Sequence, residues 1–199
     1  ARITPLAWFY MSVIFIAMIL DYPFFTVFIS ALIEHGVCDG VMGGQLLSLF
    51  TLVGIAVAAV FGTAFKHLRM KTLPLACLLC AAGMAVIFFG IGVTESFPIV
   101  VVGVCIIAIG HMAITVGVPH YVSITCTSAV ASAALAYTAM AMNLGGFVSS
   151  PYVQLVTSIE GSGDYAVVFL VSAILMLVFT VIVNAVAGKK RGDENVEVR

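Results

Sequence analysis

Long apolar segments separated by short polar ones dominate the chain. An α-helix needs about 20 apolar residues to cross the hydrocarbon core of a bilayer, and six segments reach that length. They cover residues 5–33, 41–65, 73–93, 97–118, 129–157 and 164–187. Apolar and polar residues do not alternate in them as they would in β-strands. The pattern therefore predicts an all-α membrane domain of six transmembrane helices over residues 1–188, followed by a tail at 189–199.

The composition supports lipid as the solvent for most of the chain. Hydrophobic residues make up 63% of the 199 residues, and charged residues only 9%. A soluble domain is nearer half apolar and a quarter charged. Among the five cysteines only Cys38 falls in a predicted extracytoplasmic loop, so no disulfide framework is expected. We expect the bilayer to be the main partner and expect no binding to nucleic acid.

The charged residues predict the orientation. When the connections between the six spans are assigned alternately to two sides, every basic residue falls on one side. These residues are Arg2, Lys66, Arg69, Lys71, Lys189, Lys190, Arg191 and Arg199. The other side holds the acidic residues Glu34, Asp39, Glu95, Glu160 and Asp164. The positive-inside rule then predicts a multi-pass protein of the cell (inner) membrane with both chain ends in the cytoplasm.

Polar side chains are distributed unevenly among the spans. The third and sixth spans hold almost none, so both are expected to face lipid. The first span contains Asp21 and the fourth contains His111. On the fifth span a polar stripe, within about 40° of arc at 100° per residue, consists of Ser132, Asn143, Ser150 and Gln154. The first, fourth and fifth spans are therefore the candidates for lining a polar site.

Asp21 is the first candidate for chemistry, because a carboxylate in the middle of a span costs about 2.5–3.5 kcal/mol on insertion scales. Its helical neighbours Ile14, Ala17, Phe25 and Phe28 are apolar. Asp21 must therefore face a cavity or another helix. The functional interpretation is proton coupling or recognition of a cationic substrate, and the structural one is a hydrogen bond that fixes the break at Pro23. His111 would bind substrate or relay protons, or else serve in packing.

Prolines and glycines mark candidate hinges. Pro23 removes a backbone donor and kinks the first helix, either for gating or for packing. Gly110 of the fourth span and Pro119, which directly follows that span, complete the hinge candidates. Regularly spaced glycines are also typical of close helix packing. Gly103, Gly110 and Gly117 are seven residues apart, and Gly40 and Gly44 are four apart.

Three stretches resemble the C-terminal six-helix half of a major facilitator superfamily transporter. The first runs from Gly62 through Lys66 and Arg69 to Lys71 and is similar to the family's cytoplasmic loop motif, with Lys66 in place of the usual Asp. The second runs from Asn143 through Gly145 and Gly146 to Pro151 and is similar to the signature of helix eleven. The third is the segment from Gly161 to Phe169, which is similar to the entry into helix twelve.

The resemblance implies a half bundle of two three-helix repeats, completed by an N-terminal six-helix half or by a second subunit. In that family, helices seven and ten line a central cavity and helices nine and twelve face lipid. The implied function is secondary active transport of a small solute by alternating access, as a symporter or antiporter, with the proton as the expected coupling ion. Asp21, His111, Asn143 and Gln154 are then the candidate substrate and proton-coupling residues.

Other functional classes have weaker signals. A six-helix intramembrane enzyme, a channel and an oligomeric scaffold remain alternatives. The chain contains neither Gly-x-Ser-x-Gly nor His-Glu-x-x-His. We therefore expect a protein that is not an enzyme, with no cofactor and no metal site.

Overall fold

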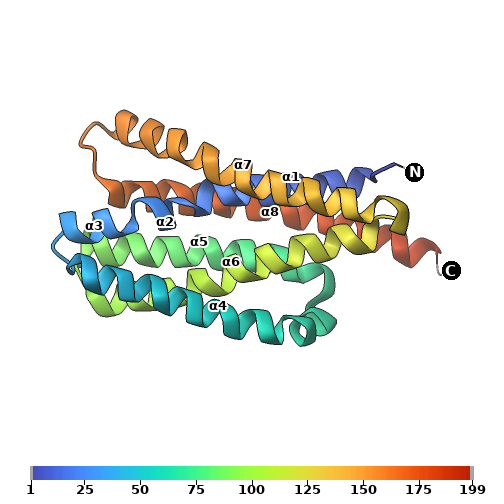
Figure 1. Cartoon of the computed structure of the whole chain (residues 1–199), viewed down its shortest axis with the longest axis horizontal. Coiled ribbons are helices and arrows are strands. Elements are labelled where there is room, and N and C mark those ends of the chain that lie inside the picture. Colours follow the sequence, from blue (N-terminus) through green and yellow to red (C-terminus); the bar gives the residue numbers. More distant parts are fainter. Residues whose placement is uncertain (1, 198–199) are drawn as a thin grey trace.

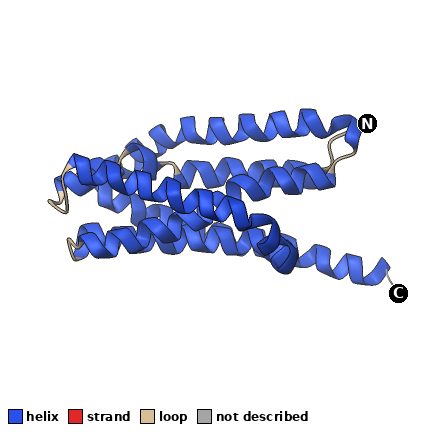
Figure 2. Cartoon of the chain, turned by 60° about the horizontal axis from the view of Figure 1, so that its bottom comes forward, coloured by secondary structure: helices blue, strands red, loops and turns tan. Residues whose placement is uncertain are grey.

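A computed structural model describes residues 2–197, with the side chains described from residue 2 to residue 186. Every regular element in this part of the chain is helical (Figures 1 and 2). The α-helices are α1 (Pro5–Asp21), α2 (Pro23–Thr26), α3 (Phe28–Glu34), α4 (Gly40–Leu68), α5 (Thr72–Phe88), α6 (Phe97–Thr125), α7 (Ser128–Glu160) and α8 (Tyr165–Glu197). A 3-10 turn, η1 (Arg69–Lys71), joins α4 to α5, and a π-helical turn, η2 (Phe89–Val93), follows α5.

The long helices run side by side along one axis and form an elongated bundle (Figure 1). Both chain ends lie at one end of the bundle, together with the α4–α5 and α6–α7 turns. The other three connections lie at the opposite end. Arg2, Arg69 and Lys71 therefore belong to the first end, and Glu34 and Asp164 to the second. The two ends carry opposite charge, and the helices between them are long and apolar enough to cross a membrane.

The first predicted span is broken into three helices. Asp21 ends α1, and Pro23 begins α2 after a single intervening residue, Tyr22. Proline has no backbone N–H to continue the ladder of α1. A second interruption follows at Val27, whose φ of −123° is not helical. The sequence pattern predicted the break at Pro23 but not the one at Val27.

Two helices continue beyond the predicted span ends. The fourth span was expected to end at residue 118, but α6 continues through Pro119 to Thr125. A proline inside a helix costs about 3 kcal/mol, and burial of Tyr121 and Val122 beyond it offsets that loss. The sixth span was expected to end near residue 187, but the α8 backbone stays helical to Glu197. The predictions for the tail fall outside the described residues where they concern the side chains of residues 189–199 or the backbone of residues 198–199.

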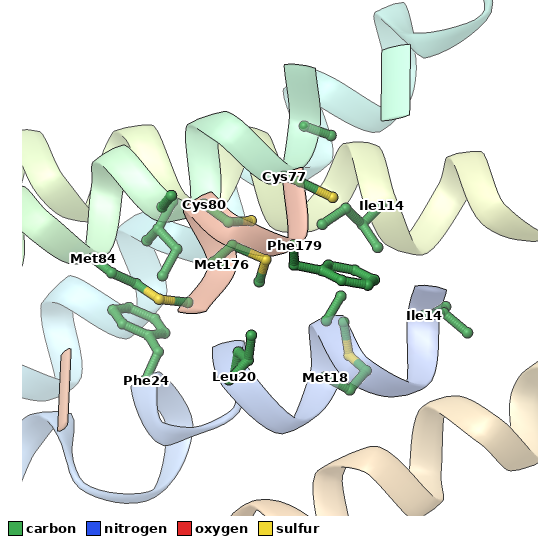
Figure 3. Packing of buried hydrophobic residues seen from close by; sticks show 14 of the residues in the cluster. Ile14, Met18, Leu20, Phe24, Cys77, Cys80, Met84, Ile114, Met176 and Phe179 are labelled. Carbon is green, nitrogen blue, oxygen red and sulfur yellow. The ribbon is translucent and has the colours of Figure 1, made fainter. Parts of the chain in front are cut away.

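The core is built around α5, which packs against α6 on one side and α8 on the other. α1 packs against α6 and α7, and α4 packs mainly against α6. Figure 3 shows Cys77 and Cys80 of α5, Met176 of α8 and Met18 of α1 in one apolar cluster. Glycines of α6 allow a close crossing with α5: a Cβ on Gly103 would lie 2.7 Å from Ile87 Cγ1, and a Cβ on Gly110 would lie 2.7 Å from Cys80 N. The glycine seam predicted on the fourth span is therefore a packing seam, whereas Gly44 has open space around it.

The exposed surfaces of α7 and α8 differ in polarity. The polar stripe of α7 is entirely exposed; its residues are Ser132, Asn143, Ser150 and Gln154. Among residues 165–186 of α8 the exposed side chains are apolar except Asn184; the large ones are Ile174, Leu175, Leu177, Val178, Val181 and Ile182. The exposed surface of α8 suits contact with lipid, whereas the stripe on α7 suits contact with water or with another polar surface.

Candidate functional site

Asp21 and His111 meet inside the bundle. The Nδ1 atom of His111 forms a hydrogen bond with the Oδ2 atom of Asp21, across the interface between α1 and α6. Asp21 is only 1% exposed and His111 is 9% exposed. Because its neighbours on its own helix are apolar, Asp21 was expected to find a partner in a cavity or on another helix, and in the structure that partner is the second candidate residue.

The local sequence explains how the pair forms. Asp21 is the last residue of α1, next to the break before Pro23. On the other helix, Gly110 precedes His111 and crosses α5 so closely that a Cβ would lie 2.7 Å from Ala76 O and Cys80 N. Because Gly110 brings the α6 backbone against α5 at this level, its neighbour His111 is held at a fixed depth next to α1.

One oxygen of the Asp21 carboxyl is not used. Oδ1 is buried and has no hydrogen-bond partner among the described residues. Cys77 and Cys80 of α5 are close enough to interact electrostatically with this carboxyl. A buried carboxylate oxygen without a donor is costly, so such an atom marks a place for a proton, a water molecule or a ligand.

Aromatic rings surround His111. The ring centroids of Phe25 and Phe50 lie 5.4 and 5.3 Å from that of His111. The two phenylalanines also contact each other edge to face, at 5.2 Å. Phe25 is partly exposed and Phe50 is buried, so this ring pair separates the Asp21–His111 pair from the outside.

Tyr22 extends this aromatic cover to α7. Its ring centroid lies 5.4 Å from that of Phe25, and a Cβ on Gly146 would lie 3.0 Å from the Tyr22 ring. The aromatic cover, defined as Tyr22, Phe25 and Phe50, therefore runs from α7 to α4. These rings were not among the predicted site residues, although two of them follow Asp21 almost directly.

Asn143 and Gln154 do not join the pair. Both side chains are exposed on α7, and the Asn143 amide donates to Ala139 O of its own helix at 2.9 Å. The four candidate residues therefore form two groups: the buried Asp21–His111 pair and the exposed polar stripe of α7. The buried side of α7 at this level consists instead of small residues, among them Gly145 and Ser149.

The hinge candidates differ in their surroundings. Pro23 stands at a real interruption of the helix. Gly110 is locked against the α5 backbone, and Pro119 lies within continuous helix. Among the three, only Pro23 therefore has a backbone geometry that suits a hinge.

The predicted cytoplasmic loop motif forms the tight turn between α4 and α5. Gly62 and Lys66 lie in the last part of α4, and Arg69 and Lys71 bound η1. Arg69 has a φ of 45°, a left-handed conformation that disfavours a side chain. The Tyr121 hydroxyl donates to Arg69 O at 2.6 Å. This bond fastens the turn to α6, and sequence reasoning did not single out Tyr121.

A second pair of the same residue types lies at the acidic end of the bundle. His35 Nε2 donates to Asp164 Oδ1 at 2.9 Å and so connects the end of α3 with the start of α8. Nearby, Asp39 caps α4 by accepting from Met42 N, and burial together with Asp39 raises the pKa of the Cys38 thiol. These groups serve separate contacts, and within the described part of the chain no three His, Cys, Asp or Glu residues are grouped to hold a metal ion.

Comparisons with known proteins do not assign this site to a family. Protein-family models, curated proteins and solved structures were compared with the chain, and none of the three comparisons found a significant match.

Proposed function

We propose that the chain is part of a proton-coupled secondary active transporter that works by alternating access. The observation that carries this proposal is the buried Asp21–His111 pair at the end of a broken helix. Such a transporter needs a site that exchanges a proton and, next to it, a backbone that can change conformation. The pair and the adjacent helix break are suited to these two tasks.

The pair suits proton exchange because either partner can hold the proton. A histidine side chain changes charge near neutral pH. The net charge of a hydrogen-bonded His–Asp pair changes by one when the pair takes up or releases a proton. Intramembrane acidic and histidine side chains are typical of proton relays. In this chain the two lie in direct contact within an apolar core.

The break at Pro23 suits alternating access. Transporters bind substrate where helices are interrupted near the middle of the membrane. Here the aromatic cover closes the site, and two of its rings, Tyr22 and Phe25, belong to the segment around the break. Movement of α2 relative to α1 would therefore move the cover and open the pair to solvent.

The exposed face of α7 supports a two-unit architecture. Its polar stripe is matched on α4 by the exposed polar residues Gln45, Ser48 and Thr51. We propose that these faces border a cavity shared with another six-helix unit, as in the C-terminal half of a major facilitator superfamily transporter. The basic end of the bundle would lie in the cytoplasm of a cell (inner) membrane.

The intact mass of the native polypeptide distinguishes the two sources of that second unit. A mass near 20.9 kDa, which is the mass of this chain, indicates a second subunit. A mass about twice as large indicates a second six-helix half in the same polypeptide, since each half needs a similar length.

Flux measurements on the full native protein test the function. Proteoliposomes with an imposed pH gradient are offered a panel of labelled amines, sugars and carboxylates. We expect saturable uptake of one class, dependent on the gradient, and loss of that dependence in Asp21→Asn. Asp164→Asn is the matched control, because it removes the same charge from the exposed pair. Asp21→Asn with an unchanged rate and unchanged pH dependence would rule out the coupling role.

A further inference from the structure

We infer that the basic end of the bundle binds one anionic phospholipid at a defined site. The inference goes beyond the proposed transport function and does not depend on it. It rests on an open apolar cleft lined by α1, η1, α5, α6 and α8, and on the basic residues next to that cleft on three of these elements. The headgroup would contact the basic residues, and one acyl chain would enter the cleft.

The cleft lies where α1 begins and where η1 leads into α5, at the basic end of the bundle (Figure 1). Its space amounts to about 280 Å³, a figure that includes room open to solvent. Most of its walls are apolar side chains, among them Leu6, Phe9, Met70, Leu73, Val183 and Val186. Apolar walls that stay open favour a hydrocarbon chain, because covering them removes apolar surface from water.

The turn η1 places two cations beside this cleft. Arg69 and Lys71 flank the wall residue Met70, and both basic side chains are exposed. The hydroxyl of Tyr121, another wall residue, donates to Arg69 O at 2.6 Å and holds the turn in place. Arg69 has a φ of 45°, and strained backbone of this kind clusters at ligand-binding sites.

Two further segments bring basic residues to the same place. Arg2 is exposed and precedes the wall residue Leu6 by four residues. Between them Thr4 donates to Thr125 O at 3.3 Å, which holds the segment against α6. On α8 the helical backbone continues from Val186 into the basic run 189–191. Basic residues grouped around a gap between transmembrane helices are typical of sites for anionic lipid headgroups.

The surroundings favour a lipid over a soluble anion and an anionic headgroup over a zwitterionic one. A soluble anion would leave the apolar walls exposed. A zwitterionic lipid would bring its own cation to a region where no described side chain is acidic. Beyond the cleft, Ile182 and Val178 are exposed and follow Val186 at four-residue spacing on one side of α8. They give the rest of an acyl chain a continuous apolar surface.

Native mass spectrometry of the full native protein in detergent tests the site, because it counts bound lipids and gives their Kd. The probes are dioleoylphosphatidylglycerol, dioleoylphosphatidylcholine with the same chains, and glycerophosphoglycerol, which is the anionic headgroup without chains. We expect one phosphatidylglycerol to bind at least about tenfold more tightly than either of the other probes, since several basic residues contribute to the attraction.

Two pairs of variants locate the site. Lys71→Gln should weaken binding of phosphatidylglycerol about fivefold, the usual contribution of one basic residue near an anionic lipid. Lys66→Gln is the matched control, because it removes the same charge at the same end but from α4, outside the elements that line the cleft. Val186→Trp should fill the cleft and remove the preference for phosphatidylglycerol. Leu177→Trp should keep it, because a separation of nine residues places Leu177 on the opposite side of α8.

Several results would overturn the inference. Equal Kd values for the two lipids contradict recognition of the headgroup. Glycerophosphoglycerol bound as tightly as the lipid contradicts a role for the acyl chain. Equal effects of Lys66→Gln and Lys71→Gln mean that charge at this end attracts lipid without a defined site. If Val186→Trp does not fold, this comparison of two exposed lysines still decides the question. Solute uptake is not part of any of these measurements, so their failure would leave the transport function standing.

Discussion

Two His–Asp pairs in the described part of the chain use the same chemistry in opposite surroundings. His111 and Asp21 meet inside the bundle with side chains 11% and 1% exposed. His35 and Asp164 meet at its acidic end with side chains 19% and 29% exposed. Each pair joins elements far apart in the chain, so sequence separation does not distinguish them. What differs is access to water.

The second difference is how well each carboxylate is satisfied without its histidine. Asp164 Oδ1 also accepts from Ala166 N at 2.7 Å, at the start of α8. Asp21 has no second partner, and its Oδ1 has none at all among the described residues. Asp164 therefore keeps a structural role when His35 is lost, whereas Asp21 depends on His111 alone. The same two residue types therefore form a structural contact at the acidic end and a candidate proton-exchange site inside the bundle.

The largest expected effect comes from removing one partner of the buried pair. His111→Leu leaves Asp21 buried without its hydrogen bond, which should lower the free energy of unfolding by about 3–5 kcal/mol. Unfolding in mixed micelles at pH 8 measures this.

The double variant Asp21→Leu/His111→Leu is the control for that measurement. It removes both charges, and a buried pair replaced by apolar residues is often as stable as the original. We therefore expect most of the stability to return. A double variant as unstable as His111→Leu would show that packing, and not an unpaired charge, dominates at this site.

The sequence was sufficient to identify both members of the buried pair. Asp21 and His111 stand out because each is the one Asp, Glu, His, Lys or Arg in its predicted span. That the two touch could not be predicted, since helical periodicity fixes the face of a side chain but not the helix it meets. Contact depends on which backbones approach closely, and that is set by glycines such as Gly110 and Gly145.

For the remaining candidate residues, the sequence pattern did not predict the tertiary surroundings. Asn143 and Gln154 share one face of α7, as the periodicity predicted, but that face is exposed and does not point to Asp21. Pro119 looked like a helix end, because local preference disfavours proline inside a helix. Tertiary packing of Tyr121 overrode that preference. The aromatic cover could not be singled out, because phenylalanine occurs in every span.

A smaller effect tests whether α5 sets the depth of His111. Gly110→Ala places a Cβ 2.7 Å from Ala76 O and Cys80 N, both backbone atoms that cannot move aside. We expect a loss of about 1–3 kcal/mol in the unfolding free energy, together with weaker coupling of transport to pH. Gly44→Ala is the matched control, because its site has open space. Equal behaviour of the two variants would contradict the packing role of Gly110.

The smallest expected effect on stability comes from changing the exposed His35–Asp164 pair. His35→Gln should lower the free energy of unfolding by about 0–1 kcal/mol, since water screens the charges and Ala166 N still satisfies Asp164. The difference between wild type and variant should fade in high salt, because screening weakens the wild-type pair further. Transport measured across a pH series should keep the wild-type profile. A shifted profile would mean that proton coupling involves the acidic end of the bundle, and access to water would then no longer separate the two pairs by role.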